Sequence, residues 1–303
     1  MNIHVGPVAA PELQEAVVAA GGRLSPAAEA SALVWYGAEP ERFGELDHPG
    51  LEWVQLPAAG IEEWAAAGAL RDGVTFTSAA GAYADTVAEH ALGLMLTGAR
   101  GLHVMARADR WERRSAAASL FGATVGILGA GGIGRSLIGL LRPFGVRVLA
   151  VNRSGRPVEG AERTWRADDA PGVREVLAAA DFLVLAAPAT AETSRLVDAD
   201  ALSRMKPGAW LVNVARGALV DTGALLAALD EGRIGGAALD VTDPEPLPDG
   251  HPLFRHPRAF VSPHSANPKS LLLPALARRV EENVRRHLAG EPLLGVVDPA
   301  AGY

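Results

Sequence analysis

The chain has 303 residues, of which 21% are charged, and its formal net charge of −7 argues against nucleic-acid binding by phosphate neutralisation. It contains no cysteine, which excludes disulfides, thiolate metal sites and a cysteine nucleophile. The N-terminus lacks the features of a signal peptide and no apolar run reaches the roughly 18 residues that span a bilayer, so we expect a cytoplasmic protein without a membrane partner.

Short apolar runs alternate with helical patterns along most of the chain. Ten of these runs are candidate strands, and they are continuously apolar, whereas half-exposed strands alternate. Such runs are typical of parallel sheets covered by helices on both faces, so we predict an α/β fold. In chain order the candidate strands are residues 3–6, 32–36, 53–56, 74–77, 124–128, 147–151, 182–186, 210–214, 237–241 and 259–262.

Three of the intervening helices have recognisable ends. Asp85 can cap one helix, and Asp221 can cap another that stops at Gly232. A third helix repeats an apolar residue every four positions and ends at Gly290. The apolar faces of the three helices are Val87, Ala91, Leu94 and Met95; Leu225, Leu226 and Leu229; and Leu276, Val280, Val284 and Leu288.

Ten strands are many for one open sheet, so we predict two doubly wound parallel-sheet domains. The first four runs would form a small sheet, and the later runs would form a second sheet. The last helix and a short strand at residues 295–297 have no obvious place in the second sheet. We expect both to return to the first.

A glycine-rich turn follows the run at residues 124–128 and opens a helix. Gly129 would allow the tight turn, Gly131 would let backbone N–H groups approach a pyrophosphate, and Gly134 would let the helix pack close to the strand. Gly132 and Ile133 complete this segment. A glycine turn without a ligand is the alternative, but the strand before it, the helix after it and the next strand favour dinucleotide binding.

The end of the next strand bears on the choice of dinucleotide. Asn152 stands where NAD-binding proteins carry an acidic residue for the ribose 2′-OH. An amide does not repel a 2′-phosphate, and Arg153 and Ser154 could bind one. The alternative is that Arg153 is a solvated surface charge and that both cofactors are accepted. We favour NADP(H), with NAD(H) possible.

Three ionisable residues each come just after a candidate strand: Arg216, Glu245 and His264. Taken singly, each has an ordinary explanation as a surface charge or a loop residue. Together they suit one reaction, because the carboxyl ends of parallel strands line the ligand crevice. Arg216 can bind a carboxylate and polarise a neighbouring keto oxygen, His264 can transfer the proton, and Glu245 can orient the histidine and favour its protonated form.

Asp240 ends another strand, where it could hold a nicotinamide amide or act as a loop carboxylate. His251 and His256 lie in a proline-rich loop without other metal ligands nearby in the sequence, so we predict no metal site. The basic cluster at residues 110–114 is interpreted as a solvated segment or as part of a subunit contact.

The sequence resembles the D-isomer-specific 2-hydroxyacid dehydrogenases over nearly its whole length. The likeness is strongest at residues 88–91, at the glycine turn, at residues 216–221 and 240–246, and at residues 262–264. It implies an Arg216–Glu245–His264 catalytic set. It also implies that Arg216 and His264 contact both substrate and cofactor, that Ala59 and Gly60 offer backbone N–H groups to the substrate, and that the cofactor site includes Pro188, Val214 and Ala215.

The resemblance further implies a Rossmann cofactor domain inserted into a flavodoxin-like substrate domain. We place the insert at residues 94–269 and the substrate domain at residues 1–93 plus 270–303, with hinges that close over the substrate. Members of the family are commonly homodimers, and residues 100–114 resemble the dimer arm.

Two positions are informative within the resemblance. Glu62 stands where an aspartate is more usual, which leaves the substrate contacts open. Glu245 separates this chain from the similar formate dehydrogenases, which carry glutamine there.

We therefore predict an oxidoreductase that transfers hydride between NADP(H) and a small 2-keto acid or D-2-hydroxy acid, such as glyoxylate or hydroxypyruvate. One alternative is a dinucleotide-sensing binding protein of the same fold. The other is a dehydrogenase of a different acid, such as 3-phosphoglycerate.

Overall fold

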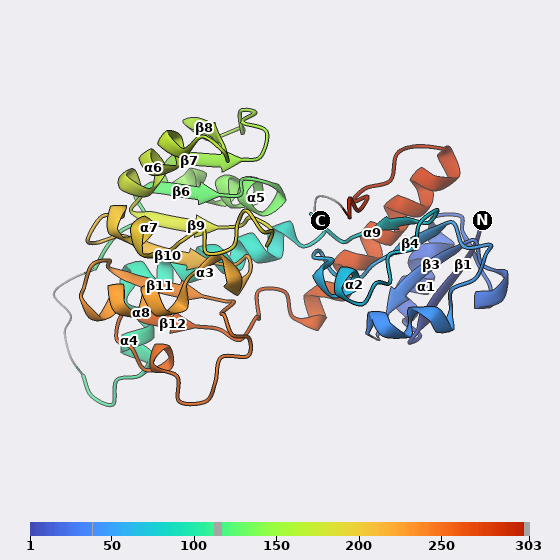
Figure 1. Cartoon of the computed structure of the whole chain (residues 1–303), viewed down its shortest axis with the longest axis horizontal. Coiled ribbons are helices and arrows are strands. Elements are labelled where there is room, and N and C mark those ends of the chain that lie inside the picture. The colour runs from blue at the N-terminus through green and yellow to red at the C-terminus, as the bar shows by residue number, and fades with distance from the viewer. Residues whose placement is uncertain (38, 112–116, 300–303) are drawn as a thin grey trace. The chain divides into compact units, whose positions relative to one another are not determined.

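The computed structural model describes residues 1–37, 39–111 and 117–299. The chain divides into two compact units, which are described separately (Figure 1). The first unit is formed by Met1–Tyr83 and Asn267–Tyr303, and the second by Ala84–Ala266. Each is built on a parallel sheet, as the continuous apolar runs predict.

The first unit has a five-stranded sheet in the order β2-β1-β3-β4-β5. Helices α1 (Pro11–Ala19) and α9 (Lys269–Ala289) pack against each other, and the short helix α2 (Glu62–Ala66) follows β4. The strands are β1 (Asn2–Pro7), β2 (Arg23–Leu24), β3 (Ala32–Tyr36), β4 (Trp53–Gln55) and β5 (Thr75–Thr77).

The end of the chain returns to this first sheet. Helix α9 lies in the first unit, and Val296 forms an isolated antiparallel bridge with Thr77. The expected place of the last helix and of residues 295–297 is therefore confirmed, although the bridge is too short to count as a strand.

A buried polar cluster fastens that returning segment. Gln55, Thr77 and Asn283 are each 0% exposed. The Asn283 amide nitrogen donates to Gln55 Oε1 at 2.8 Å and to the carbonyl of Leu294 at 3.0 Å, and Asn283 Oδ1 accepts from the Leu294 N–H at 2.8 Å. Thr77 Oγ1 donates to Gln55 Oε1 at 3.0 Å and accepts from the Trp53 indole at 2.8 Å. The cluster joins strands β4 and β5 to the C-terminal segment.

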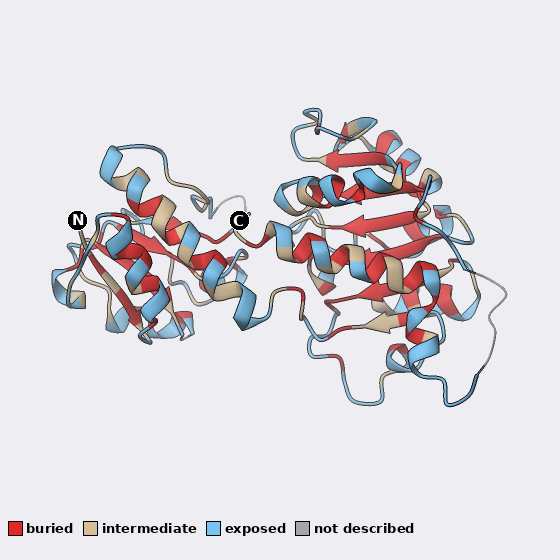
Figure 2. Cartoon of the chain, turned by 180° about the vertical axis from the view of Figure 1, so that it is seen from behind, coloured by how far each residue is buried: buried red, intermediate tan, exposed pale blue. Residues whose placement is uncertain are grey.

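The second unit has a seven-stranded parallel sheet in the order β12-β11-β10-β9-β6-β7-β8. Helices α6, α7 and α8 lie on one face and α3 and α5 on the other, and the sheet between them is buried (Figures 1 and 2). The strands are β6 (Thr124–Leu128), β7 (Arg147–Asn152), β8 (Arg163–Arg166), β9 (Phe182–Leu185), β10 (Trp210–Asn213), β11 (Gly236–Leu239) and β12 (Ala259–Val261). The helices are α3 (Ala84–Arg100), α4 (Leu102–Ala106), α5 (Gly132–Leu141), α6 (Ala170–Ala179), α7 (Ala199–Arg204) and α8 (Thr222–Asp230).

The strand order reverses direction beside β6, because β7 pairs on one side of it and β9 on the other. In open α/β sheets, ligands bind in the crevice at the carboxyl ends of strands where the order reverses. By this rule we expect a ligand to bind at the turns that follow β6 and β9.

The sequence led us to expect limits between the units at residues 93/94 and 269/270. In the structure the limits lie at residues 83/84 and 266/267. The second unit begins at Ala84 because the whole of helix α3 packs against α5, β10 and β11. It ends at Ala266, where two backbone bonds still hold the chain to Asp240 of the second unit (described below).

Candidate active site

Three glycines of the turn after β6 differ in how much space a side chain would find there. Gly129 has φ +98°, and a Cβ there would lie 2.3 Å from the backbone nitrogen of Ala187. A Cβ at Gly134 would lie 3.2 Å from Ile127 Cγ2. At Gly131, in contrast, a Cβ would meet no heavy atom within 4 Å. Glycine is thus required by the fold at position 129, a Cβ at position 134 would be tightly packed, and Gly131 faces open space.

That open space lies at the N-terminus of α5, a ten-residue helix that begins at Gly132. The first N–H groups of an α-helix have no acceptor within the helix, and here they belong to Gly132 and Ile133. Such an N-terminus favours anions, and the missing Cβ at Gly131 lets a bulky group come close to the backbone. The residues of the turn therefore fit the pyrophosphate of a dinucleotide.

The loop after β7 is organised by Asn152. Its Oδ1 accepts from the Gly155 N–H at 2.7 Å and from Ser154 Oγ at 3.2 Å, and its Nδ2 donates to the carbonyl of Arg156 at 2.9 Å. Arg153 and Ser154 are exposed on this loop. The side chain of Asn152 therefore shapes the loop, and Arg153 and Ser154 are presented to solvent by it.

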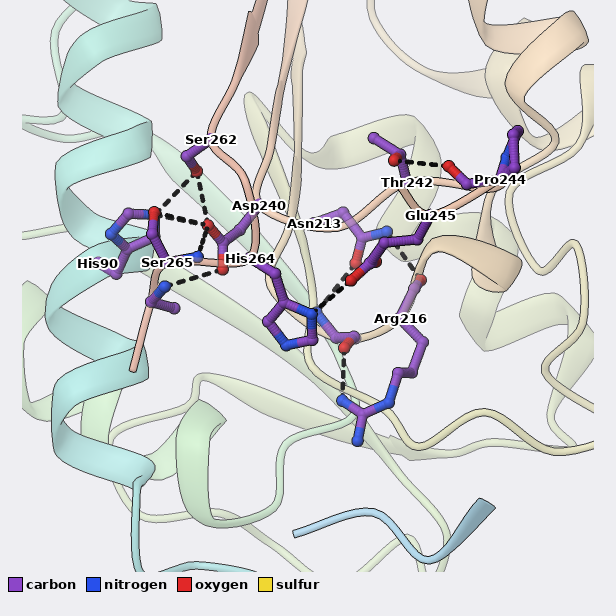
Figure 3. A network of polar contacts seen from close by, with 12 residues as sticks. His90, Asn213, Arg216, Asp240, Thr242, Pro244, Glu245, Ser262, His264 and Ser265 are labelled. Atoms are coloured by element: carbon purple, nitrogen blue, oxygen red, sulfur yellow. Dashed lines mark hydrogen bonds and ion pairs between the residues drawn. The ribbon is translucent and has the colours of Figure 1, made fainter. Parts of the chain in front are cut away.

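The predicted catalytic residues Arg216, Glu245 and His264 follow three neighbouring strands. Arg216 follows β10, Glu245 lies in the loop after β11, and His264 follows β12. Figure 3 shows the three side chains gathered at this edge of the sheet, and His264 Nδ1 lies 2.6 Å from Glu245 Oε1. Both side chains of that pair are about half exposed, so the unit leaves them accessible to a ligand.

The turn that carries Arg216 is held by Asn213, which is 1% exposed. Asn213 Nδ2 donates to the carbonyl of Arg216 at 2.9 Å, and its Oδ1 accepts from the Ala215 N–H at 3.0 Å. The guanidinium donates to the carbonyl of Ala215 at 2.8 Å. A buried amide thus fixes the backbone from which Arg216 reaches the edge of the sheet.

Asp240 organises the turn that carries His264. It is 2% exposed; its Oδ1 accepts from Ser262 Oγ at 2.6 Å and from the Ser265 N–H at 2.8 Å, and its Oδ2 accepts from the Ala266 N–H at 3.0 Å. Burial alone would raise the pKa of Asp240, but the hydrogen bonds from His90, Ser262 and the two backbone groups outweigh it and hold the pKa well below its usual value. This geometry is that of a loop carboxylate bonded to its own turn, and a bond from Asp240 to a nicotinamide amide stays a prediction.

The other predicted site residues lie in loops of both units. Pro188 follows β9 and Val214 and Ala215 follow β10, which places all three at carboxyl ends of strands in the second unit. Ala59 and Gly60 lie in the first unit, in the loop between β4 and α2. Their contacts to a substrate therefore stay a prediction.

Within residues 1–37, 39–111 and 117–299, no three His, Asp or Glu side chains are grouped so that they could hold a metal ion. No helix in the same part of the chain is both long and apolar enough to cross a membrane.

Comparison with known proteins decides the family. Residues 92–266 match the family model of the D-isomer specific 2-hydroxyacid dehydrogenase NAD binding domain. The chain is a D-isomer-specific 2-hydroxyacid dehydrogenase family member. This confirms the resemblance stated above and the prediction of an NAD(P)-dependent oxidoreductase with a nicotinamide dinucleotide cofactor.

Two curated relatives have different named substrates. The family member described here is 34% identical over 256 residues to glyoxylate reductase of Pyrococcus furiosus, which covers 80% of this chain and 74% of that one. It is also 34% identical over 247 residues to D-3-phosphoglycerate dehydrogenase of Mycobacterium leprae, covering 80% of this chain and 46% of that one. The chain therefore spans about half the length of the second relative.

Two solved structures have the same fold. One, from Xanthobacter autotrophicus Py2 in complex with NADPH and MES, has a TM-score of 0.84 at 29% identity and covers 100% of this chain and 99% of that one. The other is the NADPH-dependent glyoxylate/hydroxypyruvate reductase of Sinorhizobium meliloti in complex with NADP and sulfate, with a TM-score of 0.80 at 27% identity and the same coverage. The predicted fold class is thereby confirmed.

Three side chains of this dehydrogenase shape the site without a clear signal in the sequence: His90, Asn213 and Ser262. His90 lies between Val87 and Leu94 on the apolar face of α3, and a polar residue on such a face is the signal that could have identified it. Asn213 lies within the apolar run at residues 210–214 and Ser262 ends the run at residues 259–262, so the pattern predicts strand residues there and no role for their side chains.

Proposed function

We propose that this enzyme reduces a small 2-keto acid, such as glyoxylate or hydroxypyruvate, to the D-2-hydroxy acid with NADPH as the reductant. The observation that carries the proposal is the 2.6 Å pair of His264 Nδ1 and Glu245 Oε1, at the sheet edge to which Arg216 also belongs. Support for the substrate class and the reductant comes from the glyoxylate reductase relative and from the two NADPH- and NADP-bound neighbours.

His264 acts as the acid in this proposal. Glu245 accepts a hydrogen bond from Nδ1–H, so the other ring nitrogen, Nε2, is the atom that gives a proton to the keto oxygen. The Glu245 carboxylate keeps the ring in its orientation before and after the transfer. In the oxidation direction the same nitrogen takes the proton back from the hydroxyl group.

Arg216 binds the acid function of the substrate. Its planar guanidinium can donate two parallel hydrogen bonds to the carboxylate and polarise the neighbouring keto oxygen. Ala59 and Gly60 are proposed as further backbone N–H donors to a substrate carboxylate. The requirement for a 2-keto acid, and not for a simple ketone, follows from these carboxylate contacts.

The glycine turn, with Gly129, Gly131, Gly132, Ile133 and Gly134, holds the pyrophosphate of the cofactor. A bound reduced nicotinamide would supply a hydride, and His264 would donate the proton to the keto oxygen. Pro188, Val214, Ala215, Asp240 and His264 surround the nicotinamide half in this proposal.

The loop ordered by Asn152 selects NADPH. Arg153 and Ser154 would meet a 2′-phosphate with charge-assisted hydrogen bonds, and the neutral amide at position 152 does not repel it. We expect Asn152→Asp to shift kcat/KM from NADPH towards NADH, because the new carboxylate repels the phosphate. A wild-type preference for NADH would overturn this part of the proposal.

The test of the function is a spectrophotometric screen of 2-keto acids with NADPH and with NADH. Turnover of glyoxylate or hydroxypyruvate with NADPH, lowered about 10²–10³-fold by Arg216→Ala or His264→Ala, is the expected result. Near wild-type turnover in either variant would refute the assigned roles.

Two other outcomes correspond to the alternatives. Oxidation of 3-phosphoglycerate in preference to reduction of the small keto acids would favour the activity named in the Mycobacterium leprae relative. Tight NADPH binding without turnover of any acid in the screen would favour a dinucleotide-sensing protein.

We also propose that the enzyme is a cytoplasmic homodimer that associates through the second unit. Leu102, Met105 and Trp111 are exposed at and after helix α4, and a dimer would cover such apolar side chains. Residues 112–116 of the proposed arm lie outside the described residues. Light scattering after size exclusion should give twice the chain mass, and Trp111→Glu should reduce that value.

A further inference from the structure

His90 is a polar residue on the apolar face of a packed helix. It lies three residues after Val87 and four before Leu94 on α3, so the three side chains share one face. That face packs against β10, β11 and β12 of the second sheet. His90 Nε2 lies 3.1 Å from Ser262 Oγ and 3.2 Å from Asp240 Oδ1, next to the turn that carries His264 (Figure 3).

The hydrogen bonds fix where the proton of His90 must be. The Ser262 hydroxyl has one hydrogen, and at 2.6 Å it donates that hydrogen to the Asp240 carboxylate, which can only accept. Ser262 Oγ therefore accepts from His90, so His90 carries a hydrogen on Nε2. The same N–H also faces the buried carboxylate, and His90 is the ion-pair partner of Asp240 within the described residues.

Asp240 connects this contact to the catalytic histidine. Its two carboxylate oxygens accept from the N–H groups of Ser265 and Ala266, and its backbone carbonyl accepts from the His264 N–H at 2.8 Å. His264 itself has φ +48°, a left-handed conformation that is unfavourable for a residue with a side chain. The turn therefore needs external bonds to hold it, and Asp240 provides them on both sides of His264.

We propose that His90 is a positioning residue for His264. One N–H group of His90 contacts both Ser262 and Asp240 and fixes the position of the Asp240 carboxylate. That carboxylate holds the turn in which His264 has its left-handed conformation. The turn in turn sets the alignment of His264 with Glu245. This inference rests on the proposed function of His264 as the acid. It adds a residue on a different element, helix α3, to the group that determines the geometry of catalysis.

The test compares His90→Leu, which removes the donor, with His90→Gln, which keeps a side-chain N–H. Glu89→Gln is the matched control, because Glu89 is the exposed neighbour on the same helix. We expect His90→Leu to lower kcat about tenfold to a hundredfold with a smaller change in the KM for NADPH, since the glycine turn proposed to hold the pyrophosphate is not touched. His90→Gln should restore most of the lost kcat, and Glu89→Gln should match the wild type.

A readout that does not depend on turnover is the NMR spectrum of the enzyme labelled with ¹⁵N-histidine. The proton between His264 Nδ1 and Glu245 should give a far-downfield signal because that bond is short and charge-assisted. His90→Leu should shift or abolish this signal, and His90→Gln should retain it. The His264→Ala variant assigns the signal.

Three results would overturn the proposal. One is a folded His90→Leu variant with wild-type kcat and an unchanged His264 signal. Another is a folded His90→Gln variant that is as impaired as His90→Leu, because the donor would then not be the cause. The third applies if His90→Leu does not fold, in which case His90→Gln and Ser262→Ala are used as the test variants. Unchanged His264 signals in both of these variants would contradict the proposal.

Failure of the proposed function gives a different pattern. If the wild type reduces none of the 2-keto acids, the assigned reaction is wrong, but the His264 signal still shows whether His90 positions that ring.

Discussion

Substitution of Gly217 by alanine should separate the two loops that carry Arg216 and Glu245. Gly217 follows Arg216 directly, and a Cβ there would lie 1.8 Å from the carbonyl oxygen of Thr242 and 2.7 Å from the backbone nitrogen of Asp243. Both obstacles are backbone atoms, so no side-chain rotation can relieve the contact. The loop after β11, which leads to Glu245, or the turn at Arg216 must move.

The size of the effect follows from that distance. The closest contact must lengthen by more than about 1 Å before it reaches a separation that Cβ atoms tolerate, and a misplacement of about 1 Å in a catalytic group can lower a rate about 100-fold. Such a loss corresponds to about 2.7 kcal/mol of transition-state stabilisation. Overpacking of this kind should also reduce the free energy of unfolding by about 1–3 kcal/mol.

The assay is kcat/KM for the best 2-keto acid, measured together with the melting temperature and the Kd for NADPH. Gly223→Ala in helix α8 is the matched control, because a Cβ there would lie 3.4 Å from its nearest atom, Asp221 Oδ1. We expect Gly217→Ala to lose about two orders of magnitude in kcat/KM while it still binds NADPH. A Gly217→Ala variant with kcat/KM within about twofold of the wild type would show that the spacing of the two loops does not control catalysis.

Three further predictions concern the cofactor, acid stability and the first unit. Gly131→Ala should weaken NADPH binding at least about tenfold, or about 1.4 kcal/mol, in a fluorescence titration without lowering the melting temperature of the cofactor-free protein, because the new Cβ meets no protein atom. The pKa of Asp240 is lower in the folded protein than in the unfolded chain, where it is about 4. The carboxylate therefore stabilises the folded protein above about pH 4, and this stabilisation is lost as the pH falls towards the folded-state pKa. The difference in unfolding free energy between wild type and Asp240→Asn, measured with urea, should therefore shrink between about pH 5 and pH 3, and a constant difference would contradict the assignment. Asn283→Leu should lower the unfolding free energy by about 3 kcal/mol, because it removes the donor to Gln55 Oε1 and leaves the N–H and carbonyl of Leu294 without their partners, and an unchanged melting temperature would argue against that role.

Periodicity and apolar runs were sufficient to predict most strands because most of them are buried on both faces. The exceptions are β2 and β8, which lie at the sheet edges. In β8, Trp165 is the buried residue and both ends are exposed arginines, so no continuous apolar run exists to be recognised. The two-residue β2 is too short for any pattern.

The approach of Glu245 and His264 was predictable because each follows a strand of the same parallel sheet, and parallel strands end at a common edge. The hydrogen bonds that hold the turn of His264 in place could not be predicted from the sequence. His90 and Ser262 are 172 residues apart in the chain, and their contact depends on how α3 packs on the sheet, which no local pattern contains. For the same reason the sequence did not show that all of α3 belongs with the second unit.

The bond between Gln55 and Asn283 joins residues that are 228 positions apart, with the entire second unit between them. During synthesis, the polar cluster of the first sheet therefore stays incomplete until the ribosome has added Asn283. The intervening unit has all of its own strands by residue 261 and can fold earlier, which shortens the effective distance that the two ends must close. Nascent chains truncated before Asn283 should thus contain a protease-resistant middle and a protease-sensitive beginning.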